Sequence, residues 1–180
     1  MKLREPQKMV DAGATNRGFT LIELLVTLAV VAILLTIAVP NFQMFILNSR
    51  MATQANDLIT ALNLARSEAV KRAANVTICS SSNGTSCATG GWQQGWIVTD
   101  AGGTPLHVQP ALATGNTLTG GTDVVSTMTF TSNGRTSIPA TATIASTTLT
   151  LCPPSPASVQ GRAIQLERTG RTRVSSVACP

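Results

Sequence analysis

Aromatic and charged residues are both scarce in this sequence. It contains no tyrosine, and its four Phe and two Trp bring aromatic residues to only 3% of 180 positions. Charged residues make up 12%, about half of the usual share for a soluble domain. Hydrophobic residues make up 43%, and the mean hydropathy is +0.22. This composition excludes an intrinsically disordered chain and is unlike that of a typical soluble enzyme.

The side chains and motifs that most often carry catalysis are also missing. His107 is the single histidine, and its alternating neighbours predict a strand residue rather than a general base. The sequence has no phosphate-binding Gly-x-x-x-x-Gly-Lys motif and no Cys-x-x-Cys pair. We therefore expect no catalytic site, no metal site and no cofactor, and we predict that the protein is not an enzyme.

The charges that are present give a basic balance. Thirteen Lys and Arg stand against eight Asp and Glu, for a formal net charge of +5 and an isoelectric point near 9.6. Such a balance favours anionic partners, whether nucleic acid, lipid head groups or acidic protein surfaces. The net charge does not choose among them.

All four cysteines, Cys79, Cys87, Cys152 and Cys179, lie in the second half of the chain. An even number outside the apolar segment predicts two disulfides in an oxidising compartment. The alternative, a zinc site, usually needs pairs separated by two to four residues, and no such pair occurs. Four cysteines allow three pairings, of which we favour Cys79 with Cys87 and Cys152 with Cys179.

An apolar run from Phe19 to Val39, FTLIELLVTLAVVAILLTIAV, follows a polar amino-terminal segment. As a helix it would be about 30 Å long, the thickness of the hydrocarbon core of a bilayer. The segment before it contains more basic than acidic residues, which predicts a cytoplasmic amino end. No Ala-x-Ala-like cleavage site follows the run, so we expect a single membrane span rather than a secretory signal.

Glu23 is the one charged residue in this run. A carboxylate at membrane depth costs a few kcal/mol, so it usually has a partner or a function. Either Glu23 lies near the cytoplasmic surface and reaches water, or it pairs with a cation that this segment does not supply.

The residues around Glu23 carry a family resemblance. Residues 18–25, Gly-Phe-Thr-Leu-Ile-Glu-Leu-Leu, resemble the prepilin peptidase site of type IV pilins and type II secretion pseudopilins. In that family the chain is cut after the Gly, and the new amino-terminal residue, usually Phe, is N-methylated. The resemblance implies that residues 1–18 are a leader peptide, that cleavage separates Gly18 from Phe19, and that Phe19 is methylated.

The resemblance also implies a role for two further residues. The fifth mature residue, Glu23 here, would pair with the terminal amine of a neighbouring subunit during filament assembly. Pro40 matches a helix-bending proline that is common in the family. The implied partners are other major and minor pilins or pseudopilins, prepilin peptidase, the inner-membrane assembly platform and membrane lipid.

Beyond the apolar run, residues 40–74 predict an amphipathic helix that continues into a globular domain. Apolar positions recur at spacings of three, four or seven, as expected for one buried face. They are Phe42, Phe45, Ile46, Ala52, Ala55, Ile59, Leu62, Ala69 and Ala73. Residues 19–39, in contrast, are predicted to span the membrane or to pack in the core of a filament.

Residues 75–180 are rich in Thr, Ser, Val and Gly and predict strands. The alternating runs cover residues 76–79, 96–99, 106–109, 128–131, 143–151 and 163–166, with Gly-containing turn pairs between them. The predicted fold class is α+β. A long amino-terminal helix packs on an antiparallel sheet or sandwich of six to eight strands, as in pilins.

Motifs at the end of the helix and in the β region resemble the GspH/FimT-type branch of the pilin family. They are Ala65-Arg66-Ser67-Glu68-Ala69-Val70, Gly95-Trp96-Ile97-Val98, Phe130 with Asn133-Gly134-Arg135, and Gly170-Arg171-Thr172-Arg173.

The carboxy-terminal end is basic, since Arg162, Arg168, Arg171 and Arg173 stand there against a single acidic residue. Arg171 and Arg173 would project from one face of a strand. If Thr169-Gly170 formed a two-residue turn, Arg168 would lie opposite Arg171, where like charges are unfavourable without an anion.

Two interpretations of these arginines stay open. They protect an exposed strand edge from aggregation, or they bind phosphate. Gly170, Arg171 and Arg173 resemble a Gly-Arg-x-Arg motif linked to DNA binding in FimT-type minor pilins of naturally competent bacteria. Double-stranded DNA is therefore a candidate partner, bound weakly and with strong salt dependence. The same side chains would also suit an acidic neighbour at a filament tip.

From these features we predict a minor pilin of a type IV pilus, incorporated at or near the tip, where it primes assembly. Before assembly it would lie in the inner membrane as a single-pass protein, with its carboxy-terminal domain in the periplasm. The first alternative is the minor, H-type pseudopilin of a type II secretion system. The second is a receptor for DNA uptake in natural transformation.

Overall fold

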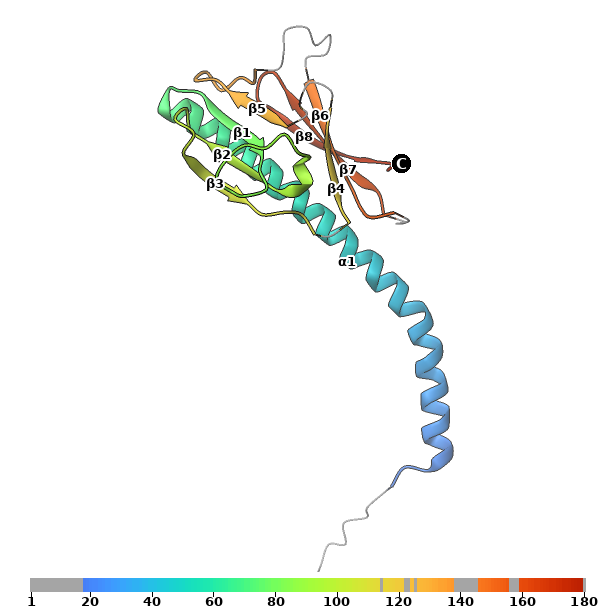
Figure 1. Cartoon of the computed structure of the whole chain (residues 1–180). Coiled ribbons are helices and arrows are strands. Elements are labelled where there is room, and N and C mark those ends of the chain that lie inside the picture. The colour runs from blue at the N-terminus through green and yellow to red at the C-terminus, as the bar shows by residue number, and fades with distance from the viewer. Residues whose placement is uncertain are drawn as a thin grey trace, which may run out of the picture. The chain divides into compact units, whose positions relative to one another are not determined.

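A computed structural model of the chain describes residues 18–113, 115–121, 124, 126–137, 146–155 and 159–179. The chain forms two compact units, which meet between Asn41 and Phe42. One helix, α1 (Leu21–Arg72), contributes to both (Figure 1). Apart from Gly18, the predicted leader peptide lies outside the described residues.

Helix α1 begins directly after Thr20, which is its N-cap. The backbone N–H of Glu23 donates a hydrogen bond to Thr20 Oγ1 (3.3 Å), and that of Leu24 donates to the Thr20 carbonyl oxygen (3.1 Å). Pro40 lies inside the helix, which continues on both sides of it. The bend expected at Pro40 stays a prediction.

The second half of α1 has one buried face. Its buried residues are Met51, Ala55, Leu58, Ala61, Leu62, Ala65 and Ala69. The predicted stripe was therefore only partly right, because it ran through Ala52 and Ile59 instead of Met51 and Leu58. Neighbouring residues on a helix point about 100° apart, and so Ala52 and Ile59 lie at the margin of this face and are half-buried.

Both ends of the predicted stripe also differ from the structure. Phe42 and Phe45 are 63% and 69% exposed, and Ala73 lies just beyond the helix. Ala73 has a positive φ of 50°, and the N–H of Ala74 bonds to the carbonyl of Ala69. This is the Schellman geometry that ends helices, here with Ala in the position that glycine usually occupies.

The first sheet has the strand order β3-β2-β1-β5, and all its pairs are antiparallel. Its strands are β1 (Val76–Ser80), β2 (Trp96–Thr99), β3 (Pro105–Gln109) and β5 (Thr127–Phe130). A short 3-10 helix, η1 (Trp92–Gln94), lies between β1 and β2.

The second sheet has the order β4-β6-β7-β8 and is also antiparallel. Its strands are β4 (Thr117–Gly120), β6 (Ser146–Cys152), β7 (Gly161–Glu167) and β8 (Thr172–Val177). The six alternating runs correspond to β1, β2, β3, β5, β6 and β7, although residues 143–145 of the fifth run lie outside the described residues. Strands β4 and β8 were not among the predicted runs.

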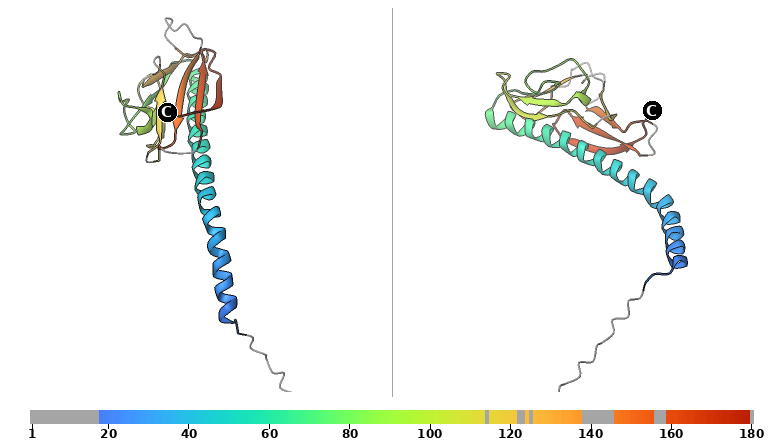
Figure 2. Two further views of the ribbon diagram at one scale, coloured as in Figure 1. Left: turned by 90° about the vertical axis from the view of Figure 1, so that its right-hand side faces the viewer. Right: turned by 60° about the horizontal axis from the view of Figure 1, so that its bottom comes forward.

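The core of the domain lies between the second half of α1 and both sheets (Figure 2). Leu58 and Leu62 of the helix belong to one cluster with residues of each sheet. The first sheet contributes Val76, Ile78, Trp96, Val98, Met128 and Phe130, and the second contributes Leu118, Leu149, Leu151, Ile164 and Leu166. The predicted α+β class, a long helix on antiparallel sheets, is confirmed.

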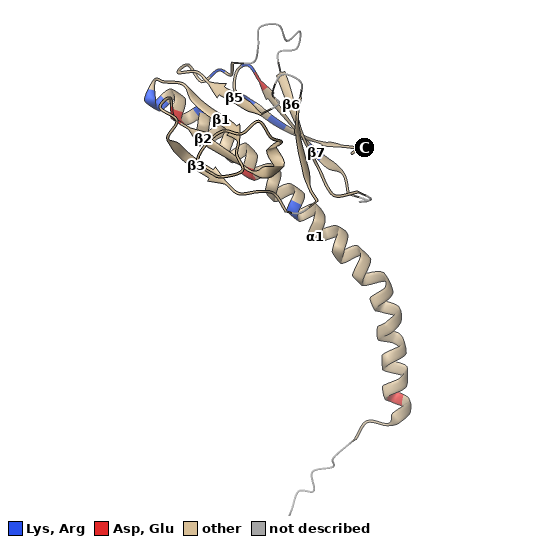
Figure 3. Ribbon diagram, viewed as in Figure 1, with Lys and Arg blue, Asp and Glu red and all other residues tan. Residues whose placement is uncertain are grey.

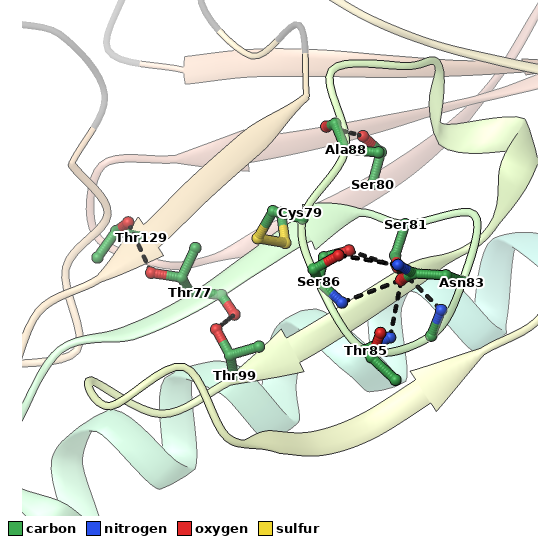
Figure 4. Close-up of a disulfide and its surroundings, with 12 residues drawn as sticks. Thr77, Cys79, Ser80, Ser81, Asn83, Thr85, Ser86, Ala88, Thr99 and Thr129 are labelled. Carbon is green, nitrogen blue, oxygen red and sulfur yellow. Dashed lines mark hydrogen bonds between the residues drawn. A yellow bond between two sulfur atoms is a disulfide. The ribbon is translucent and has the colours of Figure 1, made fainter.

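The first disulfide, Cys79–Cys87, closes a loop after β1. Cys79 lies opposite Ile97 of β2, and both side chains are fully buried. Asn83 holds the loop in shape, because its Oδ1 accepts hydrogen bonds from the backbone N–H groups of the two residues after Gly84 (2.9 and 3.0 Å; Figure 4).

The second disulfide, Cys152–Cys179, fastens the end of the chain to β6. Strand β7 lies between β6 and β8, so this link crosses Gly161 at the start of β7. A Cβ at Gly161 would collide with Cys179 Sγ and with the Leu151 carbonyl oxygen. Both disulfides are the pairs that we favoured from the sequence.

Candidate assembly helix and arginine cluster

The predicted cleavage site lies in exposed chain immediately before α1. Phe19 is 82% exposed, and among the described residues other than its chain neighbours none has an atom within 4 Å of the position that a Cβ on Gly18 would take. A peptidase therefore meets no steric obstacle from the described residues at this bond.

Glu23 is the third residue after the N-cap Thr20, the spacing of a capping box. Of the two bonds that define a capping box, the described residues form only the one from the Glu23 N–H to Thr20 Oγ1. The carboxylate forms no ion pair with any described residue. The helix amino terminus favours a negative charge at this position, yet it leaves the carboxylate open to an external cation.

The helical residues that follow are apolar and exposed. Every side chain from Leu21 to Phe45 is classed as exposed, although most of them are large and hydrophobic. Glu23 is the one charged residue between Leu21 and Phe45, and the charges of α1 are otherwise in its second half (Figure 3). By length and composition, α1 is the one helix in the described part of the chain that could cross a membrane.

The turn between β7 and β8 differs from the expected one. The Gly170 N–H donates to the Glu167 carbonyl oxygen (2.8 Å), and the Glu167 N–H donates to the Arg171 carbonyl oxygen (2.9 Å). The loop therefore has three residues, and Glu167, not Arg168, lies opposite Arg171. Gly170 takes the left-handed position of this loop, with φ at 76°, and Thr169 does not have the positive φ that a two-residue type I′ turn would also need.

This register places an acid beside the exposed arginines. Arg173 Nε of β8 lies 3.4 Å from Glu167 Oε1. Arg171, directly before β8, and Arg173 are both exposed and lie on the same face of the sheet. Glu167 thus relieves the repulsion that we expected between like charges. An exposed pair of this kind contributes little stability, so Arg173 is easily released to another anion.

Arg162 lies on the opposite face of the second sheet, contrary to the predicted grouping. It alternates in phase with Ile164 and Leu166, which point into the core. Its Nη2 donates to Asn48 Oδ1 of α1 (2.8 Å), and its Nη1 donates to Ser176 Oγ of β8 (3.2 Å). Strand alternation therefore separates Arg162 from Arg171 and Arg173.

Two arginines outside the carboxy-terminal segment lie at the β7–β8 turn instead. A Cβ on Gly170 would lie 2.9 Å from Arg66 Nε of α1 and would collide with the Gly134 carbonyl oxygen. The residue after Arg135 donates its N–H to the Arg168 carbonyl oxygen (3.0 Å), which joins the two turns.

We call this set the arginine cluster: Arg66, Arg135, Arg168, Arg171 and Arg173. Sequence reasoning did not connect Arg66 or Arg135 with the carboxy terminus. The signal was present, because both residues stand in motifs of the GspH/FimT-type branch, and those motifs meet here in space.

Glu68, in the same helical motif as Arg66, has a structural role. Arg72 Nε donates a hydrogen bond to Glu68 Oε2 (2.6 Å), and Lys71 Nζ lies 3.4 Å from Oε1. The hydrogen bond from Arg72 is the main cause that lowers the pKa of Glu68; burial opposes it, and the hydrogen bond from Lys71 lowers the pKa further. Arg72 also reaches Asp100 (3.8 Å), so these charges are paired within the chain.

Two family models match the sequence. The prokaryotic N-terminal methylation motif matches residues 14–39. The type II transport protein GspH matches residues 54–170, which is more than half of the chain. No curated protein matches at a significant level.

Solved structures with the same fold include a minor pilin of a type IV pilus and a minor pseudopilin of a type II secretion system. The type IV minor pilin FimU of Pseudomonas aeruginosa has 23% identity and a TM-score of 0.55, over 71% of this chain and 89% of FimU. The minor pseudopilin EpsH from the type 2 secretion system of Vibrio cholerae has 13% identity and a TM-score of 0.50, over 71% of this chain and 97% of EpsH. At these identities the likeness concerns the fold. The chain therefore belongs to the GspH family of pilin-like proteins and carries the amino-terminal methylation motif of prepilins.

Proposed function

We propose that this protein is a minor pilin of a type IV pilus. Prepilin peptidase removes residues 1–18, Phe19 is N-methylated, and the mature chain enters the filament at or near its tip, where it primes assembly. Until then residues 19–39 lie in the inner membrane, and residues 75–180 form a periplasmic domain to which residues 40–74 connect them.

The observation that carries this proposal is the exposed first half of α1. Burying one large aliphatic or aromatic side chain is worth about 1.5–3 kcal/mol, so more than ten of them exposed together require a bilayer or neighbouring helices. In a filament the helices of other subunits take the place of lipid. Glu23, which lacks a cation among the described residues, then pairs with the amine of a neighbour's Phe19.

The test follows the full chain in its native host. Gly18→Ala is expected to retain residues 1–18 and to stay in the membrane fraction. Glu23→Gln is expected to be cleaved and methylated normally, which mass spectrometry of the amino terminus reads, but to be missing from sheared filaments. Glu68→Gln is the matched control, because its carboxylate is paired within the chain, and it should enter filaments. Wild-type incorporation of Glu23→Gln would contradict the proposal.

Deletion of the gene distinguishes a subunit of a type IV pilus from a subunit of a type II secretion system. We expect loss of surface pili, with normal release of secreted proteins, and co-purification of the chain with a major pilin. Loss of secretion with intact pili would instead assign the chain as the H-type minor pseudopilin of a type II secretion system.

We also propose that the arginine cluster binds the phosphates of duplex DNA for uptake in natural transformation. Arg171 and Arg173 are exposed on one face of β8, and Arg135 lies on the adjoining turn. Guanidinium groups suit phosphate geometry, and a few such contacts give weak binding without sequence preference.

Duplex DNA is titrated against the full chain in detergent at low and moderate salt. The double variant Arg171→Ala/Arg173→Ala should lower affinity at least tenfold and reduce the salt slope by about two. Arg162→Ala is compared with the single variant Arg173→Ala, because each removes one positive charge and the two residues lie on opposite faces of the sheet. Equal losses in the two variants would mean a general charge effect, and would leave Arg171 and Arg173 as edge or subunit contacts.

A further inference from the structure

A second basic feature lies on the other face of the second sheet, around Arg162. A surface groove of about 490 Å³ is bounded by Met44, Phe45 and Asn48 of α1, by Val159 and Gln160 directly before β7, and by Arg162 and Ser176 of the sheet. All of these residues belong to the unit that begins at Phe42.

The Arg162 guanidinium is positioned in this groove, but its charge is not neutralised. It is half-buried, and its two bonds, to Asn48 Oδ1 (2.8 Å) and Ser176 Oγ (3.2 Å), go to neutral groups. Among the described residues no carboxylate lies within ion-pair distance of it. A guanidinium held in this way has further N–H groups to offer to an oxyanion, and phosphate matches its planar geometry.

The helix side of the groove is apolar. Phe45 is 69% exposed and Met44 is 42% exposed, and Phe42 lies one turn before them at 63%. A ligand that uses both sides of the groove therefore has an anionic group for Arg162 and hydrocarbon for Phe45 and Met44.

The distance along the chain places the groove close to the membrane span. The apolar run ends at Val39, and Asn48 is nine residues later in the same helix. At 1.5 Å per residue, chain length keeps the groove within about 14 Å of the end of the run. When the run spans the bilayer, a head-group layer roughly 5–8 Å thick begins at its end. Met44, five residues after Val39, lies about 8 Å along the helix from that point, at the outer edge of this layer.

We propose that this groove binds the phosphate of a membrane phospholipid while the chain waits in the bilayer before assembly. Arg162 contacts the phosphate, and Phe45 and Met44 lie against the glycerol backbone and the first acyl carbons. The bound head group holds the globular domain at the membrane surface. This inference rests on the membrane-inserted stage of the proposed function.

The test measures lipid retention by the full chain in detergent with native mass spectrometry. Dioleoyl phosphatidylglycerol is the probe, diacylglycerol is the same molecule without phosphate, and inorganic phosphate is the free anion. We expect the phospholipid to be retained and diacylglycerol to be lost. Arg162→Ala should weaken phospholipid binding about fivefold, Arg162→Lys less, and Arg171→Ala not at all.

Phe45→Ser keeps the test valid if Arg162→Ala impairs folding, because Phe45 is exposed and its replacement leaves the core intact. This variant should also lower phospholipid retention. Equal retention of diacylglycerol, full competition by inorganic phosphate, or equal effects of Arg162→Ala and Arg171→Ala would each overturn the proposal. Unchanged lipid binding with loss of Arg162→Ala from filaments would also overturn it, and would make the groove a contact between subunits.

Failure of the wider function has a different signature. If the wild-type chain does not stay with vesicles of either phosphatidylglycerol or phosphatidylcholine, the membrane-inserted stage itself is wrong. If the wild type and Arg162→Ala both insert and bind lipid equally, only the role of Arg162 is wrong.

Discussion

The two halves of α1 belong to one continuous helix but have opposite surroundings. Between Leu21 and Phe45 every side chain is exposed, whereas seven residues between Met51 and Ala69 are buried. The second half is amphipathic and has its partners, two sheets, in the same chain. The first half is apolar on all sides, and among the described residues nothing covers it.

The same contrast holds for charge. Glu68, in the second half, has its cations one turn away, and Glu23, in the first half, has none among the described residues. The second half is completed by folding, and under the proposed function the first half is completed by a bilayer or by neighbouring subunits. Substitutions in the second half should therefore alter the stability of the domain, and substitutions in the first half should not.

The largest expected difference comes from matched leucines. Leu58 is fully buried and Leu28 is 57% exposed. Leu58→Ala should destabilise the domain by about 3–5 kcal/mol, because it leaves a cavity in the core. Leu28→Ala should leave domain stability unchanged. Urea unfolding of the full chain in detergent, followed by the fluorescence of the buried Trp92 and Trp96, measures both. Similar losses in both variants would refute the division of α1.

Two glycines with positive φ provide the next comparison, within the β domain. Gly170 (φ 76°) lies against Arg66 and the Gly134 carbonyl, whereas Gly103 (φ 84°) has open space where a Cβ would be. Gly103→Ala should cost about 1–2 kcal/mol for the backbone conformation alone. Gly170→Ala adds a steric clash and should cost about 1–3 kcal/mol more. Thermal unfolding of both variants measures these costs. Equal costs would mean that the turn at Gly170 does not pack against the turn at Gly134.

The smallest expected effect is the pH dependence of Glu68. Its pKa is lowered by the hydrogen bond from Arg72, so its ionised form stabilises the folded chain. This contribution is present above the ordinary Glu pKa and is lost as pH falls through the lowered value. Glu68→Gln should therefore be slightly less stable than the wild type at neutral pH, and the difference should disappear as pH falls through the lowered pKa of Glu68. Melting curves across this range measure it.

Glu23→Gln is the matched control for the Glu68→Gln experiment. Because Glu23 has no cation among the described residues, its replacement should leave the pH dependence of domain stability unchanged. A shift equal to that of Glu68→Gln would show that Glu23 has a partner within the chain after all.

Features with a short-range cause could be predicted from the sequence. The apolar run, the Gly18–Phe19 motif and the alternating runs of six strands depend on residues close together in the chain, where period and composition are informative. Strand β4 was missed because it has a single buried residue, Leu118. Strand β8 was missed because none of its residues is buried, so no apolar alternation marks it.

The helix stripe shows the limit of periodicity alone. Spacings of three and four predict that the helix has a buried face, but they are compatible with more than one choice of face. Whether Leu58 or Ile59 is buried depends on where the sheets lie. The packing of both sheets on the helix determines which positions are buried.

By itself, the sequence determined the leader motif, the apolar helix, the α+β class and the presence of two disulfides. Only the tertiary structure decided that Arg162 faces α1, that Glu167 lies opposite Arg171, and that Arg66 and Gly134 meet Gly170. The physical reason is that strand register and turn length fix which face a side chain occupies. A single added residue in the β7–β8 loop changes that face, and the loop length was settled by contacts between segments far apart in the chain.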